Sequence, residues 1–450
     1  MLFPTAALRL LPLCLLALLP LYPSAVPTRT SASATAAAAR FAQRLSAAAT
    51  GAVPVTPFLV PVWQGQQFTG PDLGPGLLLK ALQGEASKLS LASPQTFKVG
   101  DFGKPASGKG TDSSGHHPAS ESRDDIKASD HDAVWDGVHK VFEGAVAQLK
   151  EAQAQSKRRR LLFLGGDHVL ASGTIGAMLA HDAKTNVVYV DAHADISNRQ
   201  PGTTQYPYLH GHPVAAAMGL DSYKANRPHG DALLPAGQLA YAGLRHLKCT
   251  AFRDLMCFLG TPAGAAATAR AGDFSPPESC EGETKDNTCA LDAGSPLCKK
   301  QKDTQAGVKC RLEAAPTFMN LTPKEVSADG AAAAKRVLEK WGYTTGTAGG
   351  KKPCIHISFD IDSLDPSLTP ATGTPVPGGI SLAGIEGFFG TLSPHVCSMD
   401  VVEFNPALGS GDAETATAPS SADGPTSKAT ATTLHNVVKA VLAAFSKPLV

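Results

Sequence analysis

Two carboxylates follow a short apolar run in the segment SFDIDSLDPSLTPATGTPVPGG, which begins at Ser358. The run itself, Pro353–Phe359, is β-branched and short, which predicts a buried strand of a parallel sheet. The strand would deliver Asp360 and Asp362 at its carboxyl end, two positions apart, so both carboxylates would point the same way. Buried like charges repel each other unless a cation lies between them. Taken alone, such a pair is more often a loop whose Asp residues cap backbone amides.

Two further strand ends change that balance. The run VVYV leads into Asp191, His193 and Asp195, which again occupy every second position. The run LLFL leads through a glycine pair, which permits a tight turn, to His168. The carboxyl ends of parallel strands lie at one edge of a sheet, where ligands bind in such folds. We therefore expect these side chains to converge on one site.

The three strand ends together supply four carboxylates and two imidazoles, a donor set typical of a metal centre. Its members are His168, Asp191, His193, Asp195, Asp360 and Asp362. Oxygen-rich sites with some imidazole suit Mn(II). The number of ligands is about what two divalent ions need if one or two carboxylates bridge them. Ions ~3.5–4 Å apart can share a water and lower its pKa, which provides a hydroxide nucleophile at neutral pH. The sequence thus predicts two Mn²⁺ per subunit.

The motifs GGDH, DAHAD and SFDIDSLDPSLTPATGTPVPGG, in this order and spacing, resemble those of the ureohydrolases, the family of arginase and agmatinase. The TPATGTPV segment and the later EFNP segment, which begins at Glu403, resemble the arginase branch most. The resemblance runs from about Pro57 to the C-terminus and is interrupted by inserts. It implies that one manganese is held by His168, Asp191, Asp195 and Asp360. The other would be held by Asp191, His193, Asp360 and Asp362, so that Asp191 and Asp360 bridge.

The same resemblance implies roles in cleaving a guanidino group to urea and an amine. Glu403 would accept the hydrogen bonds of the planar guanidinium, and Thr374 would line the same pocket. Asp362 would stabilise the tetrahedral intermediate and pass a proton to the leaving amine. His210, in the segment HGHP, would move protons to or from the reacting centre, because His titrates near neutral pH. A His that caps the following helix is the alternative for His210 and equally for His212.

The end of the pocket that would hold an amino acid departs from the family pattern. Arginases carry acidic residues just after the Arg of their GLR motif, and these help to recognise the substrate's α-amino group. Here Arg245 is followed by His246, Leu247 and Lys248. Ser197, a further candidate for substrate binding, stands where the family has Asn. The first hypothesis is therefore hydrolysis of L-arginine to L-ornithine and urea. An agmatinase or guanidino-acid ureohydrolase is the second.

A non-catalytic, arginase-like binding protein is the third hypothesis. It would work through a Cys-rich insert at about 261–314. The complete set of metal ligands argues against it. Six cysteines from Cys249 to Cys310, behind a leader that resembles a secretory signal, favour an excursion stapled by disulfides. A zinc knuckle is the alternative, but the spacings lack a CxxC pair.

Strands that alternate with helical patterns predict an α/β fold, a three-layer α/β/α domain with a mainly parallel central sheet, over residues 51–450. Helical patterns cover 77–91, 133–155, 175–180, 326–340, 382–392 and 433–445. A polar stretch at about 101–130 reads as a second insert. The basic run at 157–160 is expected to be the solvated end of a helix. Cys354 and Cys397, inside apolar strands, are expected to be buried thiols.

The N-terminus reads as a leader. Residues 1–26 have the features of a signal peptide or hydrophobic leader, namely Arg9 and a short apolar core. An uncleaved anchor is the alternative. Residues 27–50 are rich in Ala, Ser and Thr, and the first acid is Asp72, which is typical of a transit peptide or a disordered linker. We expect entry into the secretory pathway or an extracellular location, or else a plastid-like organelle or a mitochondrion.

Composition limits the partners more than the fold. The chain has 450 residues, of which 43% are apolar, enough to bury a sizeable core in one or two domains. Its formal net charge of +1 gives no case for nucleic acid as a partner. The expected partner is a small guanidino substrate. Family members commonly form trimers or hexamers, so a homo-oligomer is consistent with the resemblance, and the sequence alone does not select it.

Overall fold

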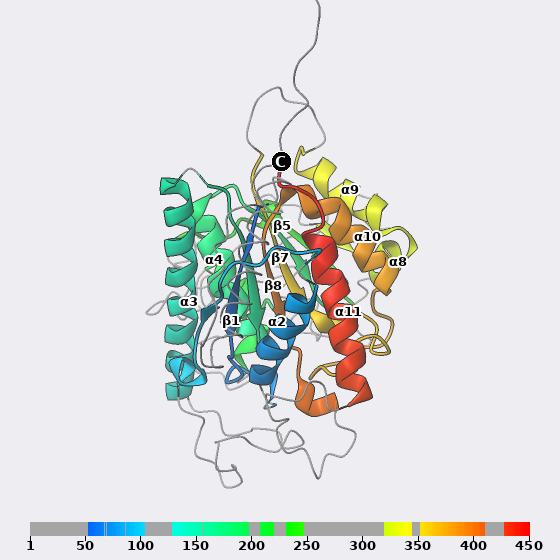
Figure 1. Cartoon of the computed structure of the whole chain (residues 1–450). Coiled ribbons are helices and arrows are strands. Elements are labelled where there is room, and N and C mark those ends of the chain that lie inside the picture. The colour runs from blue at the N-terminus through cyan, green and yellow to red at the C-terminus, as the bar shows by residue number, and fades with distance from the viewer. Residues whose placement is uncertain are drawn as a thin grey trace, which may run out of the picture. The chain divides into compact units, whose positions relative to one another are not determined.

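The computed structural model describes residues 53–103, 128–197, 208–219, 231–246, 319–343, 352–409 and 427–450, apart from 67, 69, 86 and 156. These residues form an eight-stranded sheet in the order β2-β1-β3-β8-β7-β4-β5-β6, flanked by helices (Figure 1). Every strand pair is parallel. The strands are β1 (Val55–Val60), β2 (Gln95–Thr96), β3 (Arg160–Gly165), β4 (Asn186–Val190), β5 (Leu239–Ala242), β6 (Met319–Leu321), β7 (Ile355–Asp360) and β8 (Val396–Val402).

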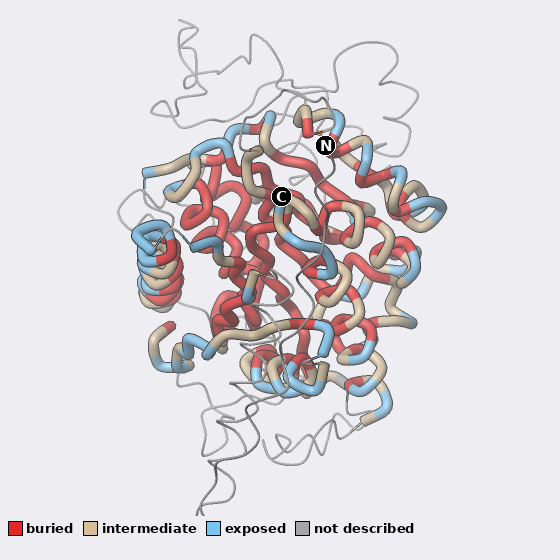
Figure 2. Tube along the Cα trace, turned by 45° about the horizontal axis from the view of Figure 1, so that its top comes forward, coloured by how far each residue is buried: buried red, intermediate tan, exposed pale blue. Residues whose placement is uncertain are grey.

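Helices cover both faces of the sheet. One face carries α3 (Ala128–Ala154), α4 (Ala171–His181) and α5 (Pro213–Ala217); the other carries α2 (Gly74–Gly84), α8 (Pro323–Ala328), α9 (Gly330–Lys340), α10 (Leu382–Leu392) and α11 (Lys428–Ala444). The strands alternate accordingly: in β3, Leu162 and Leu164 pack with the second group, and Leu161 and Phe163 with the first. The buried residues lie mainly along the strands and the inner faces of the helices (Figure 2). This confirms the predicted three-layer α/β/α fold.

One predicted helix is in fact two. The pattern over 326–340 is divided between α8 and α9, because Asp329 leaves the helical conformation and accepts a hydrogen bond from the amide of Ala332 at 2.9 Å. Gly330, which follows, packs against the backbone of α10, where a Cβ would lie 1.9 Å from the Gly384 carbonyl oxygen. The chain therefore starts a new helix where close packing demands glycine. The helix expected over 77–91 also ends earlier, at Gly84.

The basic run and the first insert need correction. Arg160 does not belong to the solvated end of a helix: it opens β3, is buried, and donates a 2.9 Å hydrogen bond to the Ser393 carbonyl. The insert expected at 101–130 is shorter, since Phe102 is buried against α3 and α3 itself begins at Ala128. Residues 104–127 lie outside the described part of the chain.

Cys354 and Cys397 are not free thiols. They form a disulfide that joins the beginnings of the neighbouring parallel strands β7 and β8. Strand periodicity predicted that both would be shielded from solvent, but it carries no information on which side chain lies opposite on the next strand. The pairing follows only from the order of strands in the sheet.

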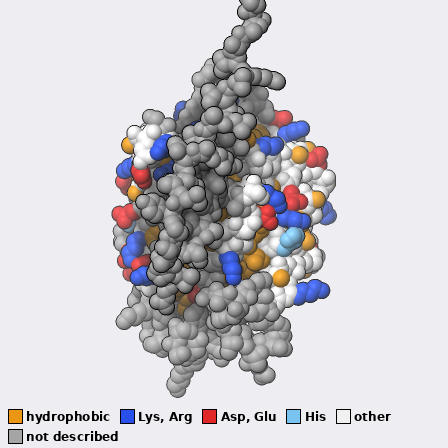
Figure 3. Space-filling model, viewed as in Figure 1, with side chains coloured by type: hydrophobic (Ala, Val, Ile, Leu, Met, Phe, Trp, Pro, Cys, Tyr) orange, Lys and Arg blue, Asp and Glu red, His pale blue; other side chains and the backbone are white. Residues whose placement is uncertain are grey.

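Several sequence predictions fall outside the described residues. The leader and transit-like segments at 1–50, the Cys-rich insert at 261–314, and Leu247 and Lys248 are among them. Among the helices that are described, none has the length and apolar character needed to cross a bilayer. On the face drawn in Figure 3, the described acidic and basic side chains are interspersed.

Candidate metal centre

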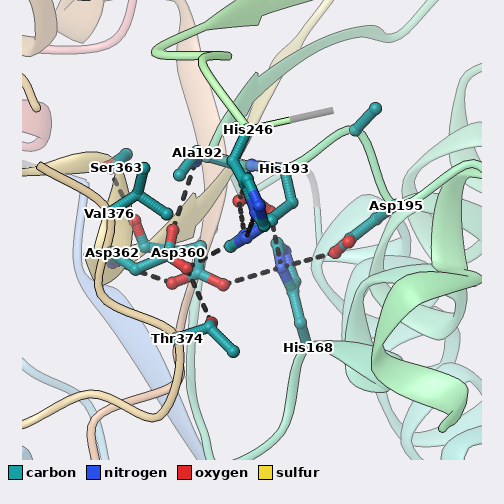
Figure 4. Close-up of polar contacts among 12 residues, drawn as sticks. His168, Ala192, His193, Asp195, His246, Asp360, Asp362, Ser363, Thr374 and Val376 are labelled. Carbon is teal, nitrogen blue, oxygen red and sulfur yellow. Dashed lines mark hydrogen bonds and ion pairs between the residues drawn. The ribbon is translucent and has the colours of Figure 1, made fainter. Parts of the chain in front are cut away.

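The predicted ligands come together at the carboxyl edge of the sheet. β3, β4 and β7 end at Gly165, Val190 and Asp360, and the loops that follow bring their Asp and His side chains together (Figure 4). The strand order places β8 between β3 and β7, and β4 beside β7. Glu403 follows β8 directly. Four neighbouring strands therefore contribute to one site.

His168 lies at the centre of the first group of ligands. Its Nδ1 is 3.0 Å from Asp191 Oδ2, 3.1 Å from Asp195 Oδ2 and 3.2 Å from Asp360 Oδ2. His168 is buried, at 1% exposure. The structure thus brings together the four residues predicted for one manganese ion.

His193 lies at the centre of the second group. Its Nδ1 is 3.4 Å from Asp191 Oδ1 and 3.1 Å from Asp362 Oδ2. The two groups share Asp191, whose two carboxylate oxygens face different histidines. Asp360 is next to this group, because the Asp362 amide donates to Asp360 Oδ1 at 2.8 Å. A carboxylate shared in this way could bridge a pair of adjacent divalent ions.

The electrostatics of the site favour a bound cation. Burial, together with the charges of Asp195 and Asp362, raises the pKa of Asp191 to about 6. Burial and the charges of Asp362 and Asp191 likewise raise the pKa of Asp360. The carboxylates outnumber the imidazoles, so divalent cations would compensate their charge, and oxygen ligands with some imidazole fit manganese.

Backbone strain marks two residues of the site. Among the described residues other than glycine, only Asp195 and Glu403 have positive φ, at 46° and 65°. Such conformations cost free energy and persist where the surrounding structure imposes them. The backbone amide of Glu403 donates to the Gly166 carbonyl oxygen at 2.6 Å, which holds the residue in place. The positive φ of Asp195 and of Glu403 therefore indicates that the fold holds these two residues in place for a function.

Glu403 is a buried carboxyl beside the candidate metal ligands. Its Oε1 accepts a hydrogen bond from the His168 amide at 2.8 Å. Burial, together with the charges of Asp167 and Asp360, raises its pKa well above the ordinary value. Asp167 is also buried, and burial raises its pKa to about 7. A positively charged ligand next to Glu403 would relieve this cost by favouring the ionised form.

The other predicted site residues are placed as follows. His210 Nδ1 lies 3.8 Å from Glu403 Oε1, and burial lowers the pKa of His210 to about 4. Thr374 Oγ1 donates to Asp362 Oδ2 at 2.9 Å. Ser197 is half-buried, and its amide donates to the Gly211 carbonyl oxygen. His212 is buried at the start of α5, and its side chain does not cap that helix.

Sequence reasoning missed two side chains that orient His168. Tyr189 OH lies 3.2 Å from His168 Nδ1 and donates to Asp195 Oδ2 at 2.8 Å. Ser358 Oγ lies 3.0 Å from His168 Nε2. Each precedes a predicted ligand by two positions on its strand, so each points to the same side of the sheet as that ligand. The alternation that identified the aspartates could have identified these residues as well.

Two more contacts come from the strand end after β5. His246 Nδ1 lies 3.0 Å from His193 Nε2, so an imidazole contacts the ring nitrogen that faces away from the second group (Figure 4). Arg245 donates through Nη2 to the carbonyl oxygens of Asp362 and Val376, each at 2.6 Å. No sequence pattern predicts these contacts. Arg245, for example, is more than a hundred positions away from Asp362.

Comparisons with known proteins agree with this geometry. The model of the family described as the arginase family matches residues 55–260 and 304–422. Arginase-1 of Oryctolagus cuniculus is 29% identical over 359 residues, covering 78% of this chain and 84% of the relative. The arginase of Saccharomyces cerevisiae is 27% identical over 362 residues, covering 78% and 86%.

Solved structures show the same fold. The arginase of Entamoeba histolytica, in complex with L-ornithine, superposes with a TM-score of 0.52 at 20% identity, covering 88% of this chain and 98% of the other. The arginase of Bacillus subtilis superposes with a TM-score of 0.51 at 18% identity, covering 88% and 100%. Motifs, family model and curated relatives agree, and the chain belongs to the arginase family, as an arginase-like ureohydrolase.

Proposed function

We propose that this chain hydrolyses L-arginine to L-ornithine and urea with two manganese ions. The observation that carries the proposal is the position of Glu403, a buried carboxyl whose Oε1 accepts from the backbone amide of His168, beside two ligand groups that share Asp191. A guanidinium is planar and cationic, and a buried carboxylate can accept two of its hydrogen bonds. The arginase names of the curated relatives support arginine as the substrate.

His168, Asp191, Asp195 and Asp360 would hold one ion, and Asp191, His193, Asp360 and Asp362 the other. Bound there, the ions would lower the pKa of a shared water and so supply a hydroxide nucleophile at neutral pH. Glu403 binds the guanidinium and presents its central carbon to the nucleophile. Burial raises the pKa of Glu403 and so disfavours its ionised form in the free protein. The positive charge of a bound guanidinium would stabilise that ionised form.

Proton transfer falls to Asp362 and His210. Despite burial, the charge of His193 and its hydrogen bond lower the pKa of Asp362, which stays ionised and can accept a proton. Thr374 orients the same carboxylate. Asp362 would take the proton that the attacking oxygen gives up as urea forms, and would pass it to the amine as the carbon–nitrogen bond breaks. His210, whose Nδ1 lies 3.8 Å from Glu403 Oε1, would relay protons between the site and solvent, and burial, which lowers its pKa to about 4, keeps the ring neutral between transfers.

A second candidate is hydrolysis of agmatine or a guanidino acid. It is favoured by His246, which occupies the position next to Arg245 where the arginase pattern has an acid, and which contacts His193 instead. Without acids there, recognition of an α-amino group would need other residues. The two candidates share the chemistry and differ only in what binds the far end of the substrate.

Urea release by the manganese-loaded chain tests both candidates. L-arginine, agmatine and 4-guanidinobutyrate are compared at equal concentration, with Glu403→Gln as a matched variant that keeps the shape of the side chain. Faster release of urea from arginine than from the other two substrates, together with loss of release from all three in Glu403→Gln, supports the proposal. A preference for a substrate without the α-amino group establishes the second candidate. Failure to release urea from any of the three, in protein shown to contain manganese, contradicts both.

A further inference from the structure

A cavity lies at the opposite edge of the sheet from the metal centre. Its volume is about 340 Å³, and Cys354 and Cys397 are among its lining residues. Both cysteines stand at the amino-terminal ends of their strands, whereas Asp360 ends β7 and Glu403 follows β8. Six strand residues span about 20 Å, so the cavity is separate from the proposed catalytic site.

The cavity combines an apolar interior with basic side chains. Apolar groups come from α3 and α4, and the disulfide itself forms part of the wall. The basic lining residues are Lys157, Arg158, Arg159 and Lys352, against two acidic groups, Asp182 and the terminal carboxylate of Val450. Arg158 donates to the backbone oxygens of Leu449 and Val450, and basic groups still outnumber acidic ones in the lining. Lys157 Nζ donates to the amide oxygen of Gln155 at 2.8 Å, a neutral acceptor that leaves its positive charge in place. Burial and then the charge of Lys352 lower the pKa of His395, which also lines the cavity.

These features suit one kind of chemistry. A disulfide is reduced by exchange with a thiolate. The thiolate must be small enough to enter the cavity, and the lining side chains must stabilise its negatively charged sulfur. Basic side chains attract an anion and stabilise a thiolate beside the bond. Cavities of a few hundred Å³ accommodate small organic molecules. The surroundings of Cys354 and Cys397 therefore differ from those of a disulfide sealed in an apolar core.

We propose that this cavity binds a small anionic thiol, which reduces the Cys354–Cys397 disulfide. In the first step, the thiolate sulfur bonds to one cysteine sulfur and the sulfur of the other cysteine leaves as a thiolate. A second molecule of the reagent attacks the mixed disulfide and releases the first cysteine. Two thiols are oxidised to one small disulfide, and the protein takes up two electrons and two protons.

Reduction would act on the two strands that carry the proposed catalytic carboxylates. β7 and β8 stay hydrogen-bonded along their length, from Ile355–Val396 to Asp360–Val402, so the sheet does not depend on the covalent bond. The bond adds a restraint that closes a 43-residue segment. Losing such a cross-link lowers thermal stability, by about 5 °C in Tm for a domain of this size. The reduced protein is thus expected to inactivate sooner on warming.

The first test compares three small thiols on the folded, full-length chain at low ionic strength. They are 2-mercaptoethanesulfonate, 2-mercaptoethanol and cysteamine, which are anionic, neutral and cationic apart from the thiol. Because the chain has nine cysteines, reduction of Cys354 and Cys397 is followed by alkylation and peptide-resolved mass spectrometry. Each rate is divided by the rate of the same thiol with an uncharged small disulfide, which removes differences in thiolate fraction.

The anionic thiol should be favoured over the neutral one on the order of tenfold, and the cationic thiol should be slowest. Salt at 0.5 M should remove most of this difference. The double variant Lys157→Gln/Lys352→Gln should lose the preference while keeping the disulfide. Lys335→Gln, an exposed lysine of α9 that does not line the cavity, is the matched control and should behave as the unmodified chain.

The second test compares Tm before and after reduction, with Cys354→Ser/Cys397→Ser as the reference that lacks the bond. The reduced chain should match this variant, and the variant should no longer respond to the thiol. Urea release after warming reports the same loss, and this readout alone rests on the proposed function. The mass-spectrometric and thermal readouts do not, so a chain that released no urea would leave the redox inference open to test.

The proposal is overturned if the three thiols, after correction, reduce the pair at equal rates. It is also overturned if the pair resists reduction until the protein unfolds, or if Tm is the same in both redox states. Finding Cys354 and Cys397 as free thiols in protein prepared without reductant would overturn it as well.

Discussion

Thr374 Oγ1 donates a hydrogen bond of 2.9 Å to Asp362 Oδ2 across twelve positions of the chain. The same oxygen lies 3.1 Å from His193 Nδ1, and the other oxygen, Oδ1, accepts from the amide of Ala192. The Asp362 carboxylate is therefore oriented by two residues that follow β4 and by one residue of a turn. This explains why the long motif around Asp362 extends well past its last carboxylate: the turn that contains Thr374 orients the residue proposed to transfer a proton.

Removing the Thr374 hydroxyl should slow the reaction more than it weakens substrate binding. In Thr374→Val, a hydrogen bond to a charged group is lost, worth about 1.5–3 kcal/mol, so kcat should fall on the order of tenfold or more. Thr374→Ser keeps the hydroxyl and should keep most of the rate. Steady-state urea release measures both variants. Equal losses in Val and Ser would show that the methyl group, rather than the hydrogen bond, matters.

Asp191 is shared by both ligand groups, so Asp191→Asn should impair both. Loss of a shared ligand should reduce urea release by at least ~100-fold, more than the loss of a residue that only orients a ligand. Metal content by mass spectrometry should fall with it. Manganese should also raise the Tm of the unmodified chain and not that of the variant, because a ligand that binds only the folded state stabilises it.

The control for Asp191→Asn is Asp136→Asn on the exposed surface of α3. It removes a carboxylate of the same chemistry far from the ligand groups, and should leave metal content, Tm shift and rate unchanged. If Asp191→Asn bound manganese and released urea as the control does, the shared-ligand arrangement would be wrong.

Manganese binding should weaken as the pH falls. Burial alone would lower the pKa of His168, but its hydrogen bonds to Asp191, Asp195 and Asp360 hold it well above the ordinary value, and the carboxylates around His193 act similarly. A proton must leave each imidazole before a metal can bind, so competition begins above pH 6.5 and grows as the pH drops. Calorimetric titration in two buffers of different ionisation enthalpy counts the released protons. No proton release between pH 6 and 8 would contradict the prediction.

Arg245 should position the segment that contains Asp362 and Thr374. Its guanidinium donates to carbonyl oxygens at both ends of that segment, including those of Asp362, Ser363 and Val376. Arg245→Met leaves these buried acceptors without their donor, so kcat should fall about tenfold with a loss of Tm. Arg245→Lys should recover only part of the rate, because a single ammonium cannot reach all of these acceptors.

Arg336 offers the matched control for Arg245. It pairs with Glu325 at 2.6 Å on the surface, and both side chains are about one-third exposed. Surface pairs contribute little, so Arg336→Met should change kcat by less than about twofold. Similar losses of rate in the two Met variants would mean that Arg245 acts through general stability and not through the position of Asp362.

Much of the site was determined by the sequence alone. Short β-branched runs that end in Asp and His at alternate positions predict strand ends with side chains on one side, and this rule requires no knowledge of neighbouring strands. It identified His168, Asp191 and Asp360 and their partners. The same local rules predicted the alternation of helices and strands and hence the three-layer fold, because each element must cover its apolar face against another.

The tertiary structure alone decided which distant groups meet. The break between α8 and α9, the buried Arg160 and the Cys354–Cys397 disulfide all depend on what packs against them from other elements. So do the contacts of Arg245 with the turn around Val376 and of His246 with His193. Periodicity reports which way a side chain faces on its own strand or helix, whereas strand order and helix packing determine what it faces. For this chain the first is sufficient to predict which Asp and His side chains gather in the candidate metal centre, and the second is needed to find the residues that hold them in place.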